Sequence, residues 1–223
     1  MRVSDVDLSS SFEQARELMV RRQIEARGVS DQRVLAAMRE IPRHIFAART
    51  HQDRSYDDCP LPIGFGQTIS QPYMVAIMTQ LLRLTGNERV LELGTGSGYQ
   101  AAILAKLAKW VYTVERIPEL SEMAKLNVAE CGLNNITFVI ADGTKGWPDE
   151  APYNAIIVTA GAPGIPVPLF DQLAEGGRLV IPVGDRFSQT LKVVEKIGGV
   201  KRTRDFLDCR FVDLVGEYGW SEP

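Results

Sequence analysis

A glycine-rich turn between a short strand and a helix is the feature that most constrains the fold of this chain. Residues 89–93 are mostly apolar, residues 94–98 read Gly-Thr-Gly-Ser-Gly, and residues 98–108 have the composition of a helix. Glycine carries no Cβ, so a turn of this kind lets bare backbone approach a nucleotide-like ligand. The pattern predicts a nucleotide-binding unit of the α/β class.

Glu115 lies where the ribose of such a ligand would be held. Residues 110–115 read as the next strand, and this strand ends on Glu115, 19 residues after Gly96. An acidic residue at that distance, at the tip of the second strand, is placed to accept hydrogen bonds from a ribose diol. A glycine turn with only a structural role is the alternative, and Glu115 argues against it. We therefore expect a cofactor that contains adenosine.

The residues around the turn favour S-adenosylmethionine over other adenosine cofactors. The glycine spacing differs from the dinucleotide fingerprint, and the Gly-Lys-Ser/Thr signature of triphosphate loops is absent from the sequence. An acidic residue directly before the turn suits a ligand with a cationic or amine-bearing end, such as a sulfonium with an α-amino group. We expect S-adenosylmethionine, and its product S-adenosylhomocysteine, to contact Glu92, Gly94, Thr95, Gly96 and Gly98.

The composition argues against a nucleic-acid or membrane protein. The chain has 223 residues, a net charge of −3 and no strongly basic segment. No stretch approaches the ~18 apolar residues that span a bilayer, and the polar N-terminus lacks a secretory signal. The three cysteines lie far apart, with no metal-binding spacing. We expect a cytoplasmic monomer that uses no metal.

Apolar strands alternate with helices after residue 85, which predicts the fold class. Such a pattern is typical of an α/β protein with a doubly wound, mostly parallel, Rossmann-like sheet that helices cover on both faces. The strands are expected at 89–93, 110–115, 136–140, 155–159 and 178–183, and the helices at 98–108, 118–131 and 166–175.

Both ends of the chain depart from this alternation. Residues 1–57 read as helical, with a division at Gly28 and a helix cap at Ser30 or Asp31. Near the C-terminus, two strands are expected at the antiparallel edge of the sheet. These two strands are placed at 190–197 and 205–215. We predict one domain over residues 1–223, which consists of three sections, 1–57, 58–84 and 85–223.

Residues 58–72 form an elaborate segment with three prolines and two glycines before a helix expected at 73–84. Ser70 is expected to cap this helix, with Pro72 in its first turn. Free N–H groups at the helix start would favour an anion. A plain proline-rich connector accounts for the segment equally well.

Asp142 and Gly143 follow the third strand of the expected sheet. Ligands of open α/β sheets bind at the carboxyl ends of the strands, so Asp142 is placed to accept from an adenine amino group, with Gly143 leaving room for the ring. A tight Asp-Gly turn without a ligand is the alternative.

The sequence offers few acid–base residues. Its two histidines, His44 and His51, show no ligand spacing, and a Ser/His/Asp hydrolase elbow is absent from the sequence. Methyl transfer to a carboxylate needs no general base, because the acceptor is already ionised at neutral pH. The Ser70 hydroxyl could hold such a carboxylate without taking its charge.

The chain resembles the protein-L-isoaspartate (D-aspartate) O-methyltransferase family. The resemblance is carried by residues 62–76, 90–102, 114–116, 142–143, 151–160, 172–184 and 211–216, and within them Gln-Thr-Ile-Ser at 67–70 is the most specific segment. It implies transfer of a methyl group from S-adenosylmethionine to the free α-carboxylate of L-isoaspartyl residues in damaged proteins. The ester then collapses to a succinimide.

The resemblance also implies roles for individual residues. Ser70 matches the family's active-site serine, and the cofactor and substrate contacts are implied at Gln67, Thr68, Ile69, Ser70, Gly94, Glu115, Asp142, Gly143, Val215 and Trp220. Asn154 and Asp213 depart from the family pattern, and we expect altered local bonding with retained activity. The alternatives are a class I methyltransferase that acts on a small molecule or RNA, and a binding protein without enzymatic activity.

Overall fold

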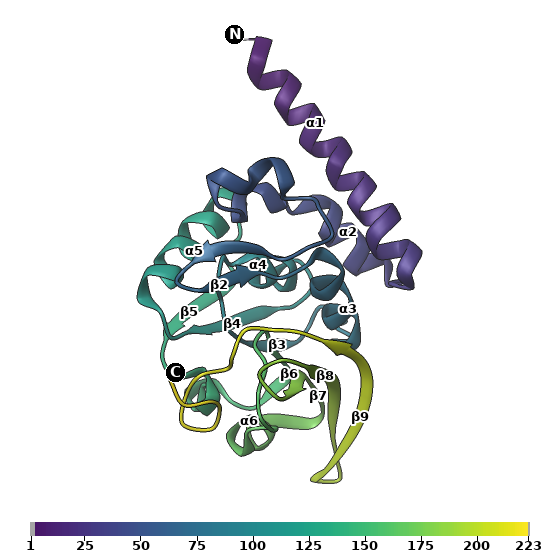
Figure 1. The fold of residues 1–223 in the computed structure, drawn as a ribbon. Helices are drawn as coiled ribbons and strands as arrows, with labels where there is room; N and C mark the ends of the chain where they lie inside the picture. The colour runs from purple at the N-terminus through teal and green to yellow at the C-terminus, as the bar shows by residue number, and fades with distance from the viewer. Residues whose placement is uncertain (1–2, 223) are drawn as a thin grey trace.

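A seven-stranded sheet forms the centre of the protein (Figure 1). The structure is a computed structural model that describes residues 3–222, with side chains from residue 11 onward. From edge to edge the strands follow the order β5 (Ile136–Ile140), β4 (Trp110–Glu115), β3 (Arg89–Leu93), β6 (Tyr153–Val158), β7 (Leu173–Gly184), β8 (Gln189–Ile197) and β9 (Val200–Cys209).

The first five strands of this order pair in parallel, and β8 and β9 each pair antiparallel with the strand before them. β3 pairs in parallel with β4 on one side and β6 on the other, and the chain winds outward from there in both directions. β7, β8 and β9 pair antiparallel. This confirms the predicted doubly wound, mostly parallel sheet with antiparallel strands at one edge. The winding changes direction between β3 and β6, where ligands of such sheets bind.

Successive residues of the central strands face opposite layers of the core. Val90 and Ile157 belong to one buried apolar cluster, and Leu91 and Ile156 belong to the other. Both faces of a parallel sheet must be covered, which is why these strands are apolar throughout. The helices that contact the sheet are α3 (Pro72–Leu82), α4 (Tyr99–Ala105), α5 (Pro118–Glu130) and α6 (Val167–Asp171). α2 (Gln32–Glu40) packs on α3 and α4, and α1 (Val3–Met19) projects from the body of the protein in Figure 1.

Short helical turns complete the connections. They are η1 (Val20–Ile24), η2 (Glu25–Arg27), η3 (Arg43–Phe46), η4 (Arg49–Arg54), η5 (Gly143–Lys145) and η6 (Pro148–Glu150). Gly28 ends η2 with a φ of 93°, and Asp31 caps α2 by accepting from the backbone N–H of Arg33 at 2.9 Å. Both features agree with the sequence analysis. Within residues 3–222, no helix is long and apolar enough to cross a membrane.

The segment before α3 differs from the predicted loop. It contains a two-stranded hairpin, β1 (Leu61–Gly64) and β2 (Gln67–Ile69), which lies apart from the main sheet in Figure 1. The predicted cap at Ser70 is wrong. The residue before α3 is Gln71, whose side chain forms no capping bond, while Pro72 occupies the first turn as predicted. Because the helix begins one residue later than a Ser70 cap requires, the Ser70 hydroxyl is not used by the helix.

Two boundaries in the C-terminal half also differ from the sequence analysis. The helix predicted at 166–175 ends at Asp171, because Leu173 already pairs with Tyr153 of β6. The last strand is β9 rather than 205–215, because the turn at 198–199 pairs Val200 directly with Ile197. Residues 210–215 therefore leave the sheet and cross its carboxyl end.

Glu92, near the carboxyl end of β3, has no exposed surface. Its Oε2 accepts from the Thr113 hydroxyl at 2.6 Å, and its Oε1 has no partner among the described residues. Burial raises the pKa of Glu92 to about 8. The side chain is therefore protonated in the folded protein at neutral pH, whereas in the unfolded chain it ionises near pH 4.

Folding therefore takes up a proton at Glu92 between about pH 5 and pH 8. The free energy of unfolding consequently falls as the pH rises through this range. A Glu92→Gln variant keeps the shape and stays neutral. Its free energy of unfolding, relative to the unmodified protein, should increase by up to about 1.4 kcal/mol per pH unit across this window. Urea unfolding of both proteins at several pH values measures the difference. Parallel pH profiles would show that Glu92 is ionised in the fold.

Candidate active site

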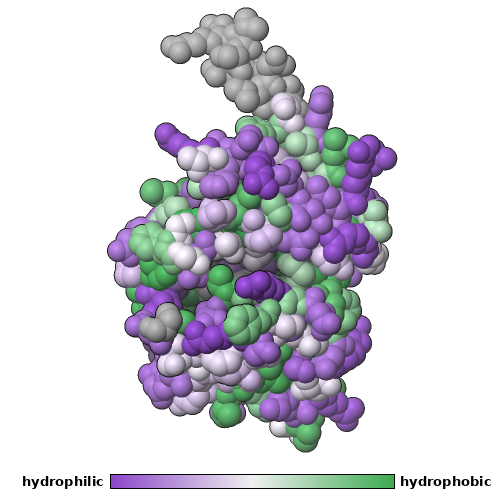
Figure 2. Space-filling view, in the orientation of Figure 1, coloured by the Kyte–Doolittle hydropathy of each residue, from purple (hydrophilic) through white to green (hydrophobic). Residues whose placement is uncertain are grey.

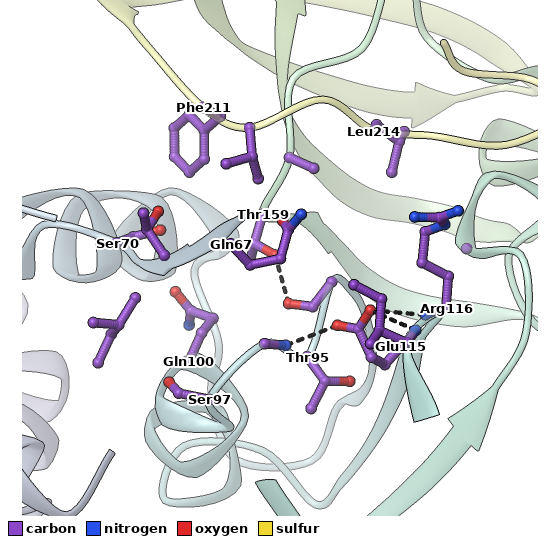
Figure 3. Close-up of a pocket in the computed structure, with 18 of the residues that line it drawn as sticks. Gln67, Ser70, Thr95, Ser97, Gln100, Glu115, Arg116, Thr159, Phe211 and Leu214 are labelled. Atoms are coloured by element: carbon purple, nitrogen blue, oxygen red, sulfur yellow. Dashed lines mark hydrogen bonds between the residues drawn. The ribbon is translucent and has the colours of Figure 1, made fainter. Parts of the chain in front are cut away.

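A cavity opens at the carboxyl ends of β3, β4 and β6, between the hairpin β1–β2 and the chain that follows β9 (Figure 3). It is lined by the turn after β3, the end of β4 and the segment 211–215. The cavity thus lies at the point where the winding of the sheet reverses, as the general rule for open α/β sheets predicts.

The glycine turn brings backbone to the floor of this cavity. Gly94 has a φ of 96°, and a Cβ at this position would collide with the Thr159 hydroxyl at the end of β6. Its N–H donates to Val114 at 2.9 Å, which holds the turn against β4. Gly98 has another purpose, because a Cβ there would lie 3.1 Å from Ala124 of α5. Gly94 therefore lets the turn pass close to Thr159 at the site, and Gly98 permits close packing of α4 on α5.

Glu115 ends β4 and lines the cavity. Its Oε2 accepts the N–H of Gly96 at 2.9 Å, and its Oε1 accepts the N–H groups of Arg116 and Ile117 at 2.8 and 3.1 Å. Three backbone donors therefore fix the orientation of this carboxylate. A carboxylate has about four acceptor positions, so capacity remains for a ligand hydroxyl.

A buried polar chain supports the turn from below. The hydroxyl of Thr95, which lines the cavity, lies 2.6 Å from the hydroxyl of Thr113, and Thr113 donates in turn to Glu92. Glu92 does not reach the cavity wall. The protonated carboxyl group lies one layer beneath the place where the sequence analysis expected a cofactor contact.

The hairpin contributes the opposite wall. Gln67, Thr68, Ile69 and Ser70 all line the cavity, and Ser70 lies across it from Glu115 in Figure 3. Ser70 is half-buried, and its hydroxyl forms no hydrogen bond with another described residue. The hydroxyl is thus available to a ligand.

Asp142 takes part in a different set of bonds from the expected one. Its carboxylate accepts the backbone N–H groups of Glu217 and Thr144, both at 2.9 Å. Burial acts to raise the pKa of Asp142, but these donors outweigh it and hold the pKa below its ordinary value. Asp142 anchors the C-terminal segment, and Gly143 rather than Asp142 lines the cavity. The adenine contact of Asp142 stays a prediction.

The C-terminal segment closes the remaining side. Val215 lines the cavity, whereas Trp220 lies outside it and donates from its indole nitrogen to the carbonyl of Gly161 at 3.0 Å. The structure therefore gathers ten of the predicted residues around one cavity and leaves four outside its lining. Glu92 and Gly98 lie behind the turn, whereas Asp142 and Trp220 line a neighbouring cavity that also borders Val215. The ten are Gln67, Thr68, Ile69, Ser70, Gly94, Thr95, Gly96, Glu115, Gly143 and Val215.

Some lining residues were missed by sequence reasoning. Gln100 is fixed by a bond from its amide nitrogen to the Thr79 hydroxyl at 2.9 Å, and no short-range signal marks it. Phe211 and Val212 reach the cavity because they leave the sheet, whereas the sequence placed them in a strand. Thr159 is the last residue of the strand expected at 155–159, and its place at a strand end is the signal that could have marked it.

The two departures from the family pattern lie in different places. Asn154 is at the amino end of β6, far along the strand from the cavity, and its Oδ1 accepts the N–H of Arg89 at 2.9 Å. Asp213 lines the cavity and forms an ion pair with Arg186 at 2.9 Å. Asn154 and Asp213 each have a polar partner nearby in space, which explains how the fold accommodates them. Within the described part of the chain, no cluster of His, Cys, Asp or Glu could hold a metal ion.

Comparison with known proteins identifies the family. The sequence model of protein-L-isoaspartate (D-aspartate) O-methyltransferases matches residues 13–219. Protein-L-isoaspartate O-methyltransferase 1 of Syntrophobacter fumaroxidans is 56% identical over 212 residues, which cover 95% of this chain and 99% of the relative. The protein-L-isoaspartate O-methyltransferase of Geobacter metallireducens is also 56% identical, over 95% of this chain and 98% of the relative.

Solved structures agree with the sequences. A protein-L-isoaspartate O-methyltransferase superposes with a TM-score of 0.82 and 32% identity, over 92% of this chain and 67% of that chain. A Plasmodium falciparum protein, solved in complex with S-adenosyl-L-homocysteine, superposes with a TM-score of 0.78 and 25% identity, over 92% and 98% of the two chains. By sequence and by structure, the chain belongs to the protein-L-isoaspartate (D-aspartate) O-methyltransferase family.

Proposed function

We propose that the chain uses S-adenosylmethionine to esterify the free α-carboxylate of L-isoaspartyl residues in damaged proteins and peptides, which starts repair through a succinimide. One observation carries the proposal. A nucleotide-type turn and the Ser70 hydroxyl, which has no hydrogen-bond partner among the described residues, face each other across a single cavity. Membership of the family supports the same reaction, and the Plasmodium falciparum relative in complex with S-adenosyl-L-homocysteine supports the cofactor.

The residues around the cavity fit the cofactor in their chemistry. Glu115 offers an oriented carboxylate for the ribose hydroxyls, and Gly94 and Gly96 offer bare backbone beside it. Gly143 and Val215 border the space that an adenine ring would occupy. When bound, S-adenosylmethionine supplies a methyl group on a positively charged sulfur.

Three of the predicted residues outside this cavity, Glu92, Gly98 and Asp142, have supporting roles in this proposal. Glu92 holds Thr113 and thereby Thr95, and Gly98 permits α4 to start directly after the turn. Asp142 fixes the segment that carries Val215. These residues would affect cofactor binding by positioning others.

The substrate carboxylate needs orientation rather than activation. A carboxyl group with a pKa of about 4 is ionised at neutral pH, so no side chain has to remove a proton. The Ser70 hydroxyl would donate a hydrogen bond to one carboxylate oxygen and leave the other free to attack the methyl group. The site then acts by alignment and by exclusion of water, and alignment of two reactants is worth many orders of magnitude in rate.

We also propose that the protein works as a monomer in the cytoplasm. At one edge of the sheet, β9 carries Lys201, Arg202, Arg204 and Asp205, and charges of this kind discourage pairing between sheet edges. The three cysteines are free thiols, as in a reducing compartment.

The reaction is tested by radiolabelled methyl transfer to an isoaspartyl peptide beside its aspartyl twin of the same sequence. We expect labelling of the isoaspartyl peptide alone. Labelling of a small molecule or an RNA, with neither peptide modified, would favour the alternative methyltransferase. Tight cofactor binding without transfer to any acceptor would favour a binding protein.

A Ser70→Ala variant tests the role of the hydroxyl. Loss of one charge-assisted hydrogen bond to the substrate, worth about 1.5–3 kcal/mol, should lower kcat/KM on the isoaspartyl peptide by roughly 10- to 100-fold. The dissociation constant of the cofactor should change much less. Ser188→Ala, in an exposed turn between β7 and β8, is the matched control. A larger effect on cofactor affinity than on turnover would assign Ser70 to the cofactor.

A Glu115→Ala variant tests the ribose contact. Removal of a buried, charged acceptor should weaken cofactor binding by roughly 1–3 kcal/mol, as measured by calorimetry. Glu119→Ala, on the exposed side of the first turn of α5, removes the same charge near the site without touching the cavity. Equal affinities for the two variants would refute the assignment.

A further inference from the structure

A second cavity, of about 810 Å3, opens beside the first. It lies between the start of α3 and the chain that leaves β9, in the hollow that crosses the face shown in Figure 2. The two cavities have common walls, formed by Thr68, Ser70, Thr159, Phe211, Val212 and Asp213. If one end of a ligand reaches Ser70 from this side, the rest of the ligand lies in the second cavity.

The position and size of this cavity suit the chain on either side of an isoaspartyl residue. The first cavity has the features of the cofactor site, so the substrate must approach Ser70 from the second. Its volume is in the range of cavities that bury ligands well beyond a single amino acid. An extended peptide advances about 3.3 Å per residue, so the nearest few neighbours of the isoaspartyl residue would contact its walls.

Two of the three arginines that line this cavity are already paired. Arg27 binds Asp58 at 2.7 Å and lies over the Tyr73 ring at 3.6 Å. Arg186 binds Asp213 at 2.9 Å. Their charges are largely balanced by these partners, and their side chains are held in place.

Arg210 differs from the other two. Its side chain is exposed, and it forms no ion pair or hydrogen bond with any other residue in the described part of the chain. It directly precedes Phe211, which borders both cavities. The unpaired acid on this wall is Asp208, whose Oδ1 accepts from the Thr190 hydroxyl at 3.3 Å. Arg210 is therefore the cation of the cavity that lacks a fixed partner.

We propose that Arg210 is a specificity residue that favours isoaspartyl substrates with a carboxylate side chain within a few residues of the isoaspartyl position. The inference rests on the proposed function and adds to it a preference among substrates. A guanidinium binds carboxylates through paired N–H donors, and its attraction acts on substrate binding rather than on methyl transfer itself. Because the side chain is exposed, the preference weakens as ionic strength rises.

The test uses isoaspartyl peptides that differ at one neighbouring position, which carries Glu, Gln or Lys, scanned over three residues on each side. For the unmodified protein at low salt, kcat/KM should be higher for Glu than for Lys by roughly threefold or more at one or more of these positions. Arg210→Glu should invert that order, and Arg210→Gln should abolish it. The change should appear in KM, with kcat nearly constant.

Arg204→Glu is the matched control, because it makes the same charge change on β9 outside the cavity. It should leave the Glu-to-Lys ratio unchanged. The proposal is overturned if the unmodified protein shows no charge preference, or if Arg210→Glu and Arg204→Glu give the same ratios. Failure to methylate any isoaspartyl peptide would instead refute the proposed function, so the two outcomes are distinguishable.

Discussion

The hydrogen bond from the Gly96 N–H to the Glu115 carboxylate is the interaction on which the geometry of the site depends. β3 and β4 are parallel neighbours, with Leu93 opposite Val114, so the residues after them emerge at the same edge of the sheet. The bond, at 2.9 Å, ties the turn after β3 to the tip of β4. A ligand placed by the turn is thereby placed relative to the carboxylate as well. The protein's own hydrogen bonds are sufficient to set this register.

The substrate side of the site depends on a segment that does not belong to the sheet. After β9 the chain crosses the carboxyl ends of the strands, where Gly161 donates to Val212 at 2.7 Å and receives a bond from Leu214 at 2.8 Å. These bonds to the end of β6 hold Phe211 and its neighbours as a wall common to both cavities. In the proposed reaction, cofactor and substrate would meet along this one stretch of backbone, opposite Ser70.

The sequence predicted the parts of the molecule that follow from local pattern. The strands at β4 and β5, a cap at Ser30 or Asp31 and the position of Glu115 were all accessible, because periodicity, turn chemistry and strand ends are local properties. The hairpin β1–β2 was missed because prolines and glycines conceal short strands. The path after Cys209 was missed because its bonds join it to Gly161, far away in the chain.

The same distinction between local patterns and tertiary contacts explains which residues of the site were predicted. The glycine turn and Glu115 were found from turn chemistry and strand ends. Gln100 and Phe211 lie in segments that carry the family resemblance, but they reach the cavity only through tertiary packing. Asp142 shows the reverse case. Its place at a strand tip favoured a ligand contact, which stays a prediction, and its carboxylate also holds Glu217 of the C-terminal segment. No sequence pattern reveals a bond between residues so far apart.

The central claim is that the cavity aligns a carboxylate oxygen with the sulfur of the cofactor while the Ser70 hydroxyl holds that carboxylate. A crystal structure with S-adenosylhomocysteine and an isoaspartyl peptide tests it most directly. The account predicts the isoaspartyl α-carboxylate at hydrogen-bond distance, about 2.7 Å, from Ser70 Oγ, with one oxygen directed at the sulfur. A carboxylate bound elsewhere in the groove, with the Ser70 hydroxyl directed away from it, would contradict the account.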